Sequence, residues 1–388
     1  MEPSRERTKE STRAYLEAEI GFCNHWYPAV FRSELEDGAA KPVTLLGEKI
    51  LVRLVDGKAC AIEDRCAHRR VLFSAKLECY TRDTVTCWYH GFTYRFTDGA
   101  LVQVLTDPEC PLIGKMRLRT YPVAEAQGIV FLFIGDGAPP PLGDDLAPGF
   151  TDADMAIAGM RRAILGNWRL ATENGFDTTH IYIHRNSAVV TETDAVLPLG
   201  FVPQDKQAIE IVAGPTGPKG IVDKLYLSYV PVFQALIDDT MVSAVLKENG
   251  SMVAPEVSCW VPGALKLENF PFEGYYIFEW YVAIDEKTHT YFQILGKRVK
   301  SEEERREHEA KAHGYWKDVL WRGFNDQDLF AREWLEEAYT EGEGWAKERL
   351  YKPDMCLVEW RKLASKHNRG IQKRPGARAN GGAQSACS

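Results

Sequence analysis

The sequence predicts an α+β chain with two domains: an all-β domain, then a larger domain that combines an antiparallel sheet with helices. Two tight-turn signals in the first third of the chain, Asp56-Gly57 and Asp98-Gly99, separate short apolar segments that are typical of β-hairpins. After three consecutive prolines, Pro139 to Pro141, the pattern changes to strands mixed with helices. Because consecutive prolines end both sheets and helices, this segment is the predicted domain boundary.

Four segments follow from this division. A short N-terminal helix is expected within residues 1–23, and residues 24–137 form the all-β domain. Residues 138–371 form the second, α+β domain. The tail, residues 372–388, is rich in glycine, alanine, serine and arginine and is expected to be disordered.

The second domain has recognisable helix and strand signals. Ser301 and Glu304 have the spacing of a capping box, which predicts a helix start. The expected elements are a helical stretch over 167–185, two antiparallel strands over 275–283 and 288–296, and helices over 301–310 and 326–338.

The composition limits the function classes. Of 388 residues, 26% are charged and 45% are hydrophobic, which is enough to bury a core. A net charge of -8 argues against nucleic acid as the main partner. There is no apolar run of membrane-spanning length and no signal-peptide core at the N-terminus, so we expect a soluble, cytoplasmic protein.

Two short segments of the predicted all-β domain each carry one cysteine and one histidine. Cys66 and His68 are separated by one residue, and Cys87 and His90 by two. A [2Fe–2S] cluster of the Rieske kind takes two thiolates on one iron and two imidazoles on the other. Because each segment follows a predicted strand, a β scaffold can bring both pairs face to face, and the pattern predicts such a cluster.

A structural zinc ion is the main alternative for these four side chains, because Zn²⁺ takes the same ligands in a tetrahedron. Zinc fingers usually separate a cysteine pair from a histidine pair, whereas each segment here has one of each. The pattern therefore favours the iron–sulfur cluster.

A second pair of histidines, His180 and His184, lies in the predicted helical stretch. At positions i and i+4 of a helix, two imidazoles face the same side, as chelation of one metal ion requires. Asp177 is placed to accept the N–H of the His180 ring and so to orient it. Two histidines and one carboxylate form the open iron site that activates dioxygen, so a third ligand is expected from elsewhere in the chain.

The third ligand is expected at the acidic start of the helix predicted over 326–338. Asp326 and Asp328 are both candidates, and spacing alone does not separate them, because acidic residues are also common at helix starts. We expect His308 and His313 to face solvent on a charged helix. The alternative histidine partners are His25, His289, His308, His313 and His367.

These motifs, in this order, resemble those of the α subunits of Rieske non-haem iron ring-hydroxylating oxygenases, and the resemblance covers nearly the whole chain. It implies that Asp328 rather than Asp326 is the iron ligand. It also implies that Asp177 links His180 to a cluster histidine, His90, of the neighbouring subunit. The implied assembly is a head-to-tail homotrimer, because cluster and iron of one chain would be too far apart for electron transfer.

Further stretches, among them residues 167–177 and 359–365, are similar to family members that carry out angular dioxygenation of carbazole-like tricyclic aromatics. The resemblance implies a terminal oxygenase that uses O₂ and receives electrons from NAD(P)H through a reductase and a ferredoxin. Arg70 and Phe92 depart from the family, which commonly has glycine and tryptophan there, and Arg70 puts the turn of the first motif in question. Residues 204–250 match least well, which leaves the substrate entrance open.

A flat aromatic substrate requires an apolar slot with few polar groups. The carbonyl of Gly175, just before the expected iron ligands, is a candidate acceptor for a ring N–H. Glu279 is a candidate inward-facing acid. The candidate apolar walls are Leu265, Leu267, Phe270, Phe324 and Phe330.

Two other functions remain open at this point. One is a Rieske oxygenase that mono- or dihydroxylates another polycyclic or N-heteroaromatic substrate. The other is an electron-transfer Rieske protein or a zinc module, which needs only the first constellation. This last function would leave about 250 residues beyond the proline segment without a role.

Overall fold

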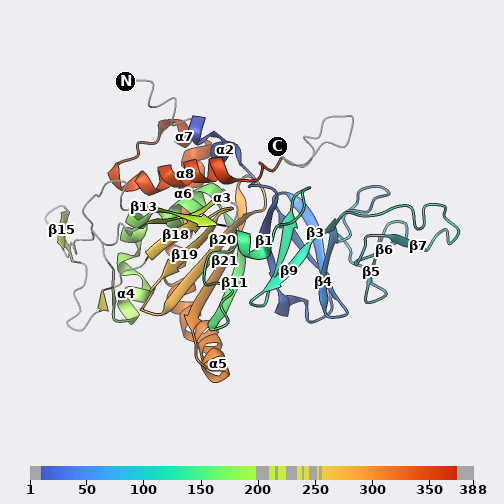
Figure 1. Cartoon of the computed structure of the whole chain (residues 1–388), viewed down its shortest axis with the longest axis horizontal. Helices are drawn as coiled ribbons and strands as arrows, with labels where there is room; N and C mark the ends of the chain where they lie inside the picture. The colour runs from blue at the N-terminus through green and yellow to red at the C-terminus, as the bar shows by residue number, and fades with distance from the viewer. Residues whose placement is uncertain are drawn as a thin grey trace. The chain divides into compact units, whose positions relative to one another are not determined.

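The computed structural model describes residues 10–197, 209–214, 217–223, 234–237, 240–243, 251–252 and 256–373. The chain divides into two compact units (Figure 1). Residues 23–142, with the chain from Gln372, form what we call the β unit. Residues 143–371, with the chain up to Phe22, form the α+β unit. Within the described residues, no helix has the length and apolar character needed to cross a membrane.

In its described residues, the β unit contains three antiparallel sheets, in the orders β2-β3-β4-β8, β1-β10-β9 and β5-β6-β7. The hairpin predicted at Asp56-Gly57 is confirmed, because both residues have positive φ angles (48° and 77°), as a tight two-residue turn requires. The strands are β1 (His25–Phe31), β2 (Lys41–Leu45), β3 (Glu48–Val55), β4 (Lys58–Glu63), β5 (Thr84–Thr86), β6 (Phe92–Arg95), β7 (Leu101–Val104), β8 (Thr120–Tyr121), β9 (Val123–Ala126) and β10 (Ile129–Ile134), with 3₁₀ turn η1 (Arg32–Leu35).

The α+β unit is built on a seven-stranded antiparallel sheet in the order β11-β21-β20-β19-β18-β14-β13. The two predicted strands are confirmed as neighbours β20 (Tyr275–Ala283) and β21 (Thr288–Arg298). The other strands of this sheet are β11 (Met155–Leu165), β13 (Ile209–Gly214), β14 (Gly217–Asp223), β18 (Glu256–Trp260) and β19 (Ala264–Glu268). Two small pairs accompany it: β12 (Ala195–Val196) with β17 (Ser251–Met252), and β15 (Gln234–Ile237) with β16 (Thr240–Ser243).

Helices cover this sheet (Figure 1). Helix α3 (Trp168–Phe176) packs on β18, β19 and β20, and α8 (Met355–His367) packs on β14. The N-terminal helix α2 (Arg13–Glu17) is a short helix that packs on α8. The buried rings of Tyr15, Trp168 and Trp360 join these helices into one core, because aromatic residues bury the largest apolar area per side chain.

The remaining helices lie mostly in the last third of the chain. Ser301 caps α5 (Glu302–Lys311) by accepting the N–H of Glu304, which confirms the predicted helix start. The wide π-helical segment η6 (Ala312–Arg322) leads to α6 (Asn325–Thr340). The shorter elements are η2 (Leu142–Asp145), η3 (Thr178–Asn186), α4 (Ala188–Glu192), α7 (Gly344–Lys347) and η7 (Lys352–Asp354).

Candidate active site and metal centres

The predicted helical stretch over 167–185 is interrupted at Asp177. Helix α3 ends there because Asp177 adopts an extended conformation (φ −71°, ψ 103°). Its carboxylate Oδ1 then accepts the backbone N–H of Thr179 at 2.8 Å and caps a separate 3₁₀ helix, η3. The two histidines therefore lie on a 3₁₀ segment, not on the continuous α-helix that the sequence suggested.

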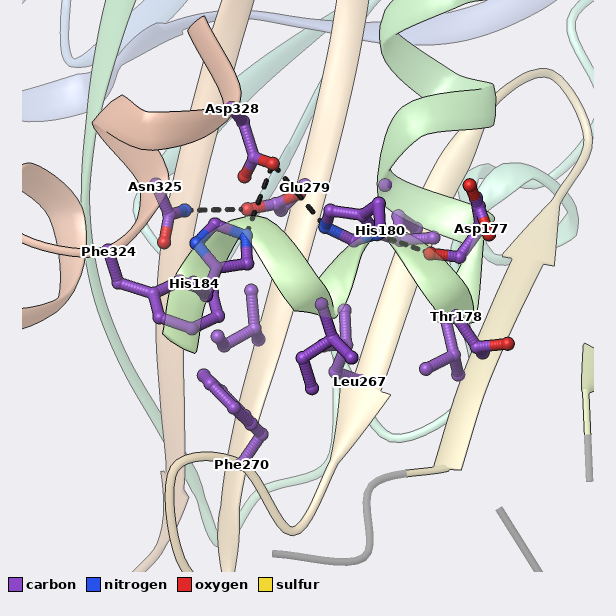
Figure 2. Close-up of a pocket in the computed structure, with 15 residues that line it drawn as sticks. Asp177, Thr178, His180, His184, Leu267, Phe270, Glu279, Phe324, Asn325 and Asp328 are labelled. Atoms are coloured by element: carbon purple, nitrogen blue, oxygen red, sulfur yellow. Dashed lines mark hydrogen bonds and ion pairs between the residues drawn. The ribbon is translucent and has the colours of Figure 1, made fainter. Parts of the chain in front are cut away.

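His180, His184 and Asp328 converge on one point. Their ligand atoms all lie within 4.8 Å of one another. Oδ1 of Asp328 is 3.3 Å from Nε2 of His180 and 3.3 Å from Nε2 of His184 (Figure 2). Asp326, the competing candidate, instead forms an ion pair with Arg162 at 2.5 Å. Because α6 turns about 100° per residue, the two aspartates face different directions and only Asp328 faces the histidines.

Both imidazoles are oriented by contacts through their other nitrogen. Nδ1 of His184 lies 3.0 Å from Oε1 of Gln327, and the ring stacks on Phe324 with centroids 3.7 Å apart. Nδ1 of His180 bonds to the backbone carbonyl of Asp177, not to the carboxylate that the sequence suggested. The contact of Gln327 with His184 was not predicted from the sequence. The position of Gln327 between the two candidate acids, Asp326 and Asp328, was a signal that it lies near the site. These contacts leave both Nε2 atoms directed toward Asp328.

The electrostatics of this group suit a divalent cation. Burial alone would raise the pKa of Asp328, but the two histidines outweigh it and hold that pKa well below its usual range. Burial disfavours the charged form of His180, yet the hydrogen bond and charge of Asp328 raise its pKa to about 9. Nε2 of the buried His184 is 3.3 Å from the Asp328 carboxylate and forms no well-directed hydrogen bond with a described residue. An unsatisfied buried nitrogen beside a carboxylate is what a metal ligand presents before the metal binds.

A cavity adjoins this group, and its empty volume of about 570 Å³ includes space that is open to solvent. Figure 2 shows Leu267, Phe270 and Phe324 around it. Its predicted lining residues are Gly175, Leu265, Leu267, Phe270, Phe324 and the candidate inward-facing acid Glu279, and its further lining residues include Ile181, Val257, Ile277 and Asn325. Most of the exposed wall is therefore apolar, and the polar lining residues are Asp177, Thr178, His180, His184, Glu279, Asn325 and Asp328.

Phe330 and Gly175, both predicted near the substrate, lie in different places relative to the cavity. Phe330, a candidate wall, is 69% exposed on the outer face of α6, so this prediction is wrong. The reason is helical geometry, since Phe330 is two residues from Asp328 and points away from it. Gly175 lines the cavity, and a Cβ there would lie 2.3 Å from the hydroxyl oxygen of Tyr281, so only glycine fits.

The remaining histidines lie outside this group. His289 is buried and bonds through Nδ1 to the carbonyl of Gly166 at 2.7 Å. His308 is only 4% exposed, with Nε2 3.0 Å from the carbonyl of Leu295, so the prediction that it faces solvent is wrong. His308 is the helix residue that turns to the sheet, whereas His313 is exposed as predicted.

The four predicted cluster ligands come from two loops of the β unit with the same backbone hydrogen bonds. In the first loop, Cys66 accepts the N–H of Arg70 at 2.8 Å, and in the second, Cys87 accepts the N–H of Gly91 at 2.9 Å. Arg70 has a positive φ of 60°, close to the 70° of Gly91. The turn that was in question is therefore the same in both loops, although only one of them has glycine.

The two cysteines are buried, whereas His68 is exposed and His90 is partly exposed. The two imidazole rings are close, with centroids 4.8 Å apart. Ligands of one tetrahedral zinc ion would lie within about 4 Å of each other. Within the described part of the chain, these four residues do not form such a tight group. Inner cysteines and outer histidines match the two unlike irons of a Rieske cluster instead.

Comparison with known proteins agrees with this geometry. Residues 133–372 match the family described as homotrimeric ring hydroxylase, and residues 25–122 match the Rieske [2Fe–2S] domain. The chain belongs to this ring-hydroxylase family. One relative, the terminal oxygenase component CarAa of carbazole 1,9a-dioxygenase from Sphingomonas sp, is 48% identical over 95% of this chain and 97% of its own.

Solved structures of ring hydroxylases extend the comparison. The terminal oxygenase of carbazole 1,9a-dioxygenase from Novosphingobium sp. KA1 has a TM-score of 0.90 and 47% identity, covering 95% of this chain and 99% of that one. A reduced complex between oxygenase and ferredoxin in carbazole 1,9a-dioxygenase has a TM-score of 0.88 and 45% identity, covering 96% and 97%. These likenesses confirm the predicted α+β fold, with an all-β Rieske domain and a catalytic domain.

Family membership fixes the class of chemistry. The protein is a Rieske non-haem iron ring-hydroxylating oxygenase of a homotrimeric family. Its cofactors are a Rieske [2Fe–2S] cluster and a mononuclear iron, and O₂ is the co-substrate. A pure electron carrier or a zinc module is thereby excluded.

Proposed function

We propose that this protein is the terminal oxygenase of a system that carries out angular dioxygenation of carbazole-like tricyclic aromatics. The ring-fusion carbon beside the bridging nitrogen and its neighbour each receive one atom of O₂, and the unstable product opens to an aminobiphenyl diol. NAD(P)H supplies two electrons through a reductase and a ferredoxin. The observation that carries this proposal is the apolar cavity directly beside the two-histidine, one-carboxylate group, together with the relatives named above.

The metal ligands follow from the donor sets. His180, His184 and Asp328 would hold the mononuclear iron, which when bound would supply the open positions needed to activate dioxygen. The buried Nε2 of His184, which is directed at the Asp328 carboxylate 3.3 Å away, supports this assignment. The cluster irons would be held by Cys66 and Cys87 on one side and by His68 and His90 on the other.

Asp177 is the residue that would connect the two centres between subunits. Its carbonyl bonds Nδ1 of His180, and its Oδ1 bonds Thr179. Oδ2 has no hydrogen bond to any described residue, and the side chain is only partly buried. This free oxygen can accept an N–H from His90 of a neighbouring subunit, so that one residue touches both metal-binding sets.

The cavity would hold the substrate between apolar walls. Leu265, Leu267, Phe270 and Phe324 provide flat apolar surface for a tricycle. The carbonyl of Gly175 would accept the N–H of the bridging nitrogen, which fixes the angular carbon relative to the iron ligands. The system would operate in the cytoplasm, where NAD(P)H is available to the reductase.

A product assay with a surrogate ferredoxin and reductase tests this function. We expect ring-opened diols from carbazole and dibenzofuran, and little product from naphthalene, which fills less of the cavity. Dibenzofuran has the same shape but no N–H, so its KM should be about 5-fold higher if the Gly175 carbonyl accepts that hydrogen bond. Efficient hydroxylation of naphthalene without ring opening of carbazole would instead support a different polycyclic substrate.

A further inference from the structure

A buried cation lies beside the proposed iron ligand. Arg332, one turn after Asp328 on α6, is 0% exposed. Its terminal nitrogen Nη2 is 3.9 Å from Oδ2 of Asp328, the carboxylate oxygen that does not form the close contacts to the histidines. The two oxygens of Asp328 therefore face different partners, the imidazoles on one side and a guanidinium on the other.

The guanidinium has few other polar contacts. Its Nε donates to Oδ1 of Asn174 at 2.8 Å, and Nη1 and Nη2 have no hydrogen-bond partner in the described structure. Its central carbon lies 4.9 Å and 4.5 Å from the ring centroids of Tyr281 and Tyr291, which is cation–π distance. A guanidinium does not lose its proton in proteins, so this site keeps a permanent positive charge.

Asn174 connects this cation to the same carboxylate. While its Oδ1 accepts from Arg332, its Nδ2 lies 3.4 Å from Oδ1 of Asp328. Asn174 is buried at the end of α3, the helix that precedes the histidines. Arg332 and Asn174 thus contact Asp328 from two sides, and both are held by packed elements.

Packing alone does not account for an arginine at this position. A buried guanidinium with two unsatisfied nitrogens is costly, and an apolar side chain of similar volume would fill the space at lower cost. The Asp328 carboxylate lies within ion-pair distance of Nη2, and the buried Glu279 carboxylate also acts on this guanidinium. The positive charge of Arg332 therefore acts on a metal ion that the Asp328 carboxylate binds.

We propose that Arg332 is a positioning residue for the mononuclear iron, which fixes the Asp328 carboxylate and places a permanent positive charge behind it. This rests on the proposed assignment of Asp328 as ligand. A nearby positive charge destabilises a ferric ion more than a ferrous ion, so it favours the ferrous state that binds dioxygen. Asn174 has the complementary role of aligning Arg332 with the carboxylate.

The test is an anaerobic potentiometric titration of the iron-loaded trimer, in which the EPR signal of the high-spin ferric ion gives the midpoint potential of the mononuclear site. We expect Arg332→Met to shift this midpoint to more negative potential. Arg332→Lys, which keeps the positive charge, should have a midpoint potential close to that of the unmodified protein. The potential of the Rieske cluster should stay unchanged in both variants, because the charge acts locally.

Arg162→Met is the matched control, because Arg162 contacts Asp326 on the same helix and not Asp328. It should leave the midpoint unchanged. A merely structural role for Arg332 would lower stability in the Met and Lys variants alike and would not move the potential. An unshifted midpoint in Arg332→Met, or equal shifts in both variants, would overturn the proposal.

If Arg332→Met does not fold, the proposal is tested with Asn174→Leu. The measurement is then the Fe(II) affinity of this variant in competition with a chelator. We expect about 10-fold weaker Fe(II) binding, as for loss of other residues that orient metal ligands. Unchanged affinity would overturn the proposal. None of these measurements requires carbazole turnover, so failure of the substrate assignment is distinguishable. Absence of a ferric signal in the unmodified protein would refute the metal site and this proposal together.

Discussion

The two metal-binding regions are assembled in different ways. In the β unit, the four proposed ligands come from two neighbouring loops with the same backbone hydrogen bond, in which the N–H of Arg70 or Gly91 donates to the carbonyl of Cys66 or Cys87. In the α+β unit, two histidines on η3 meet a carboxylate from α6, far along the chain. The first site is thus specified by local turns, whereas the second depends on how helices pack on the sheet. A substitution in one site should therefore disrupt that site and leave the other intact.

The largest expected effect is that of Asp328→Ala. The substitution removes one of three proposed iron ligands and leaves Arg332 without its carboxylate partner. The variant should therefore lose the mononuclear iron, and its turnover rate should fall by about 1000-fold or more. The visible spectrum of the Rieske cluster should persist, because the cluster lies in the other unit. Iron analysis with absorbance spectroscopy measures both. Asp326→Ala is the control and should retain iron; the opposite pattern would reverse the ligand assignment.

Asp177→Asn should affect communication between the centres rather than either centre. The backbone carbonyl that orients His180 remains, so both metals should be retained. Turnover should fall by about 100-fold, because the amide no longer offers a charged oxygen to the neighbouring histidine. Single-turnover kinetics of the prereduced trimer would measure this. Full activity would refute the proposed link.

The two cluster loops offer a test of how locally the β unit is specified. In Gly91→Ala, the new Cβ would lie 2.8 Å from Cβ of Leu105 at a positive φ, so the temperature of cluster loss should drop by about 5 °C or more. Arg70→Gly relieves the same backbone conformation and removes only a half-exposed ion pair with Glu63. Its effect on that temperature should be within about 3 °C, and a large loss would show that Arg70 itself matters to the cluster.

The smallest expected effect is the response of the α+β unit to mild acid. Burial, with the charge of Arg332, lowers the pKa of His289 to about 3, below its value of about 6.5 in an unfolded chain. The contribution of neutral, buried His289 to the free energy of unfolding is complete above pH 6.5. This contribution decreases as the pH falls, by at most about 1.4 kcal/mol per pH unit. Denaturant unfolding followed by tryptophan fluorescence at pH 7 and 5.5 measures this loss. His289→Gln should lose less stability over the same interval, and an equal loss would exclude His289 as the source.

The sequence by itself determined the local features of this protein. Cys66-x-His68 and Cys87-x₂-His90 are contiguous motifs on tight turns, and turns are set by neighbouring residues, as at Asp56-Gly57. The strands β20 and β21 and the cap of α5 at Ser301 were predictable for the same reason. The pocket residues adjacent to these motifs, such as Gly175, could also be proposed.

Only the tertiary structure decided the features that depend on side-chain direction. The rotation of α6 against η3 places Asp328, and not Asp326, beside the two histidines; spacing alone left both open, and only the family resemblance favoured Asp328. The same rotation turns Phe330 outward and brings Arg332 to the ligand carboxylate. The break at Asp177 arises because its side chain caps η3 and ends α3. In each case the local sequence pattern allows a side chain to lie on more than one face of its helix, and long-range packing selects the face.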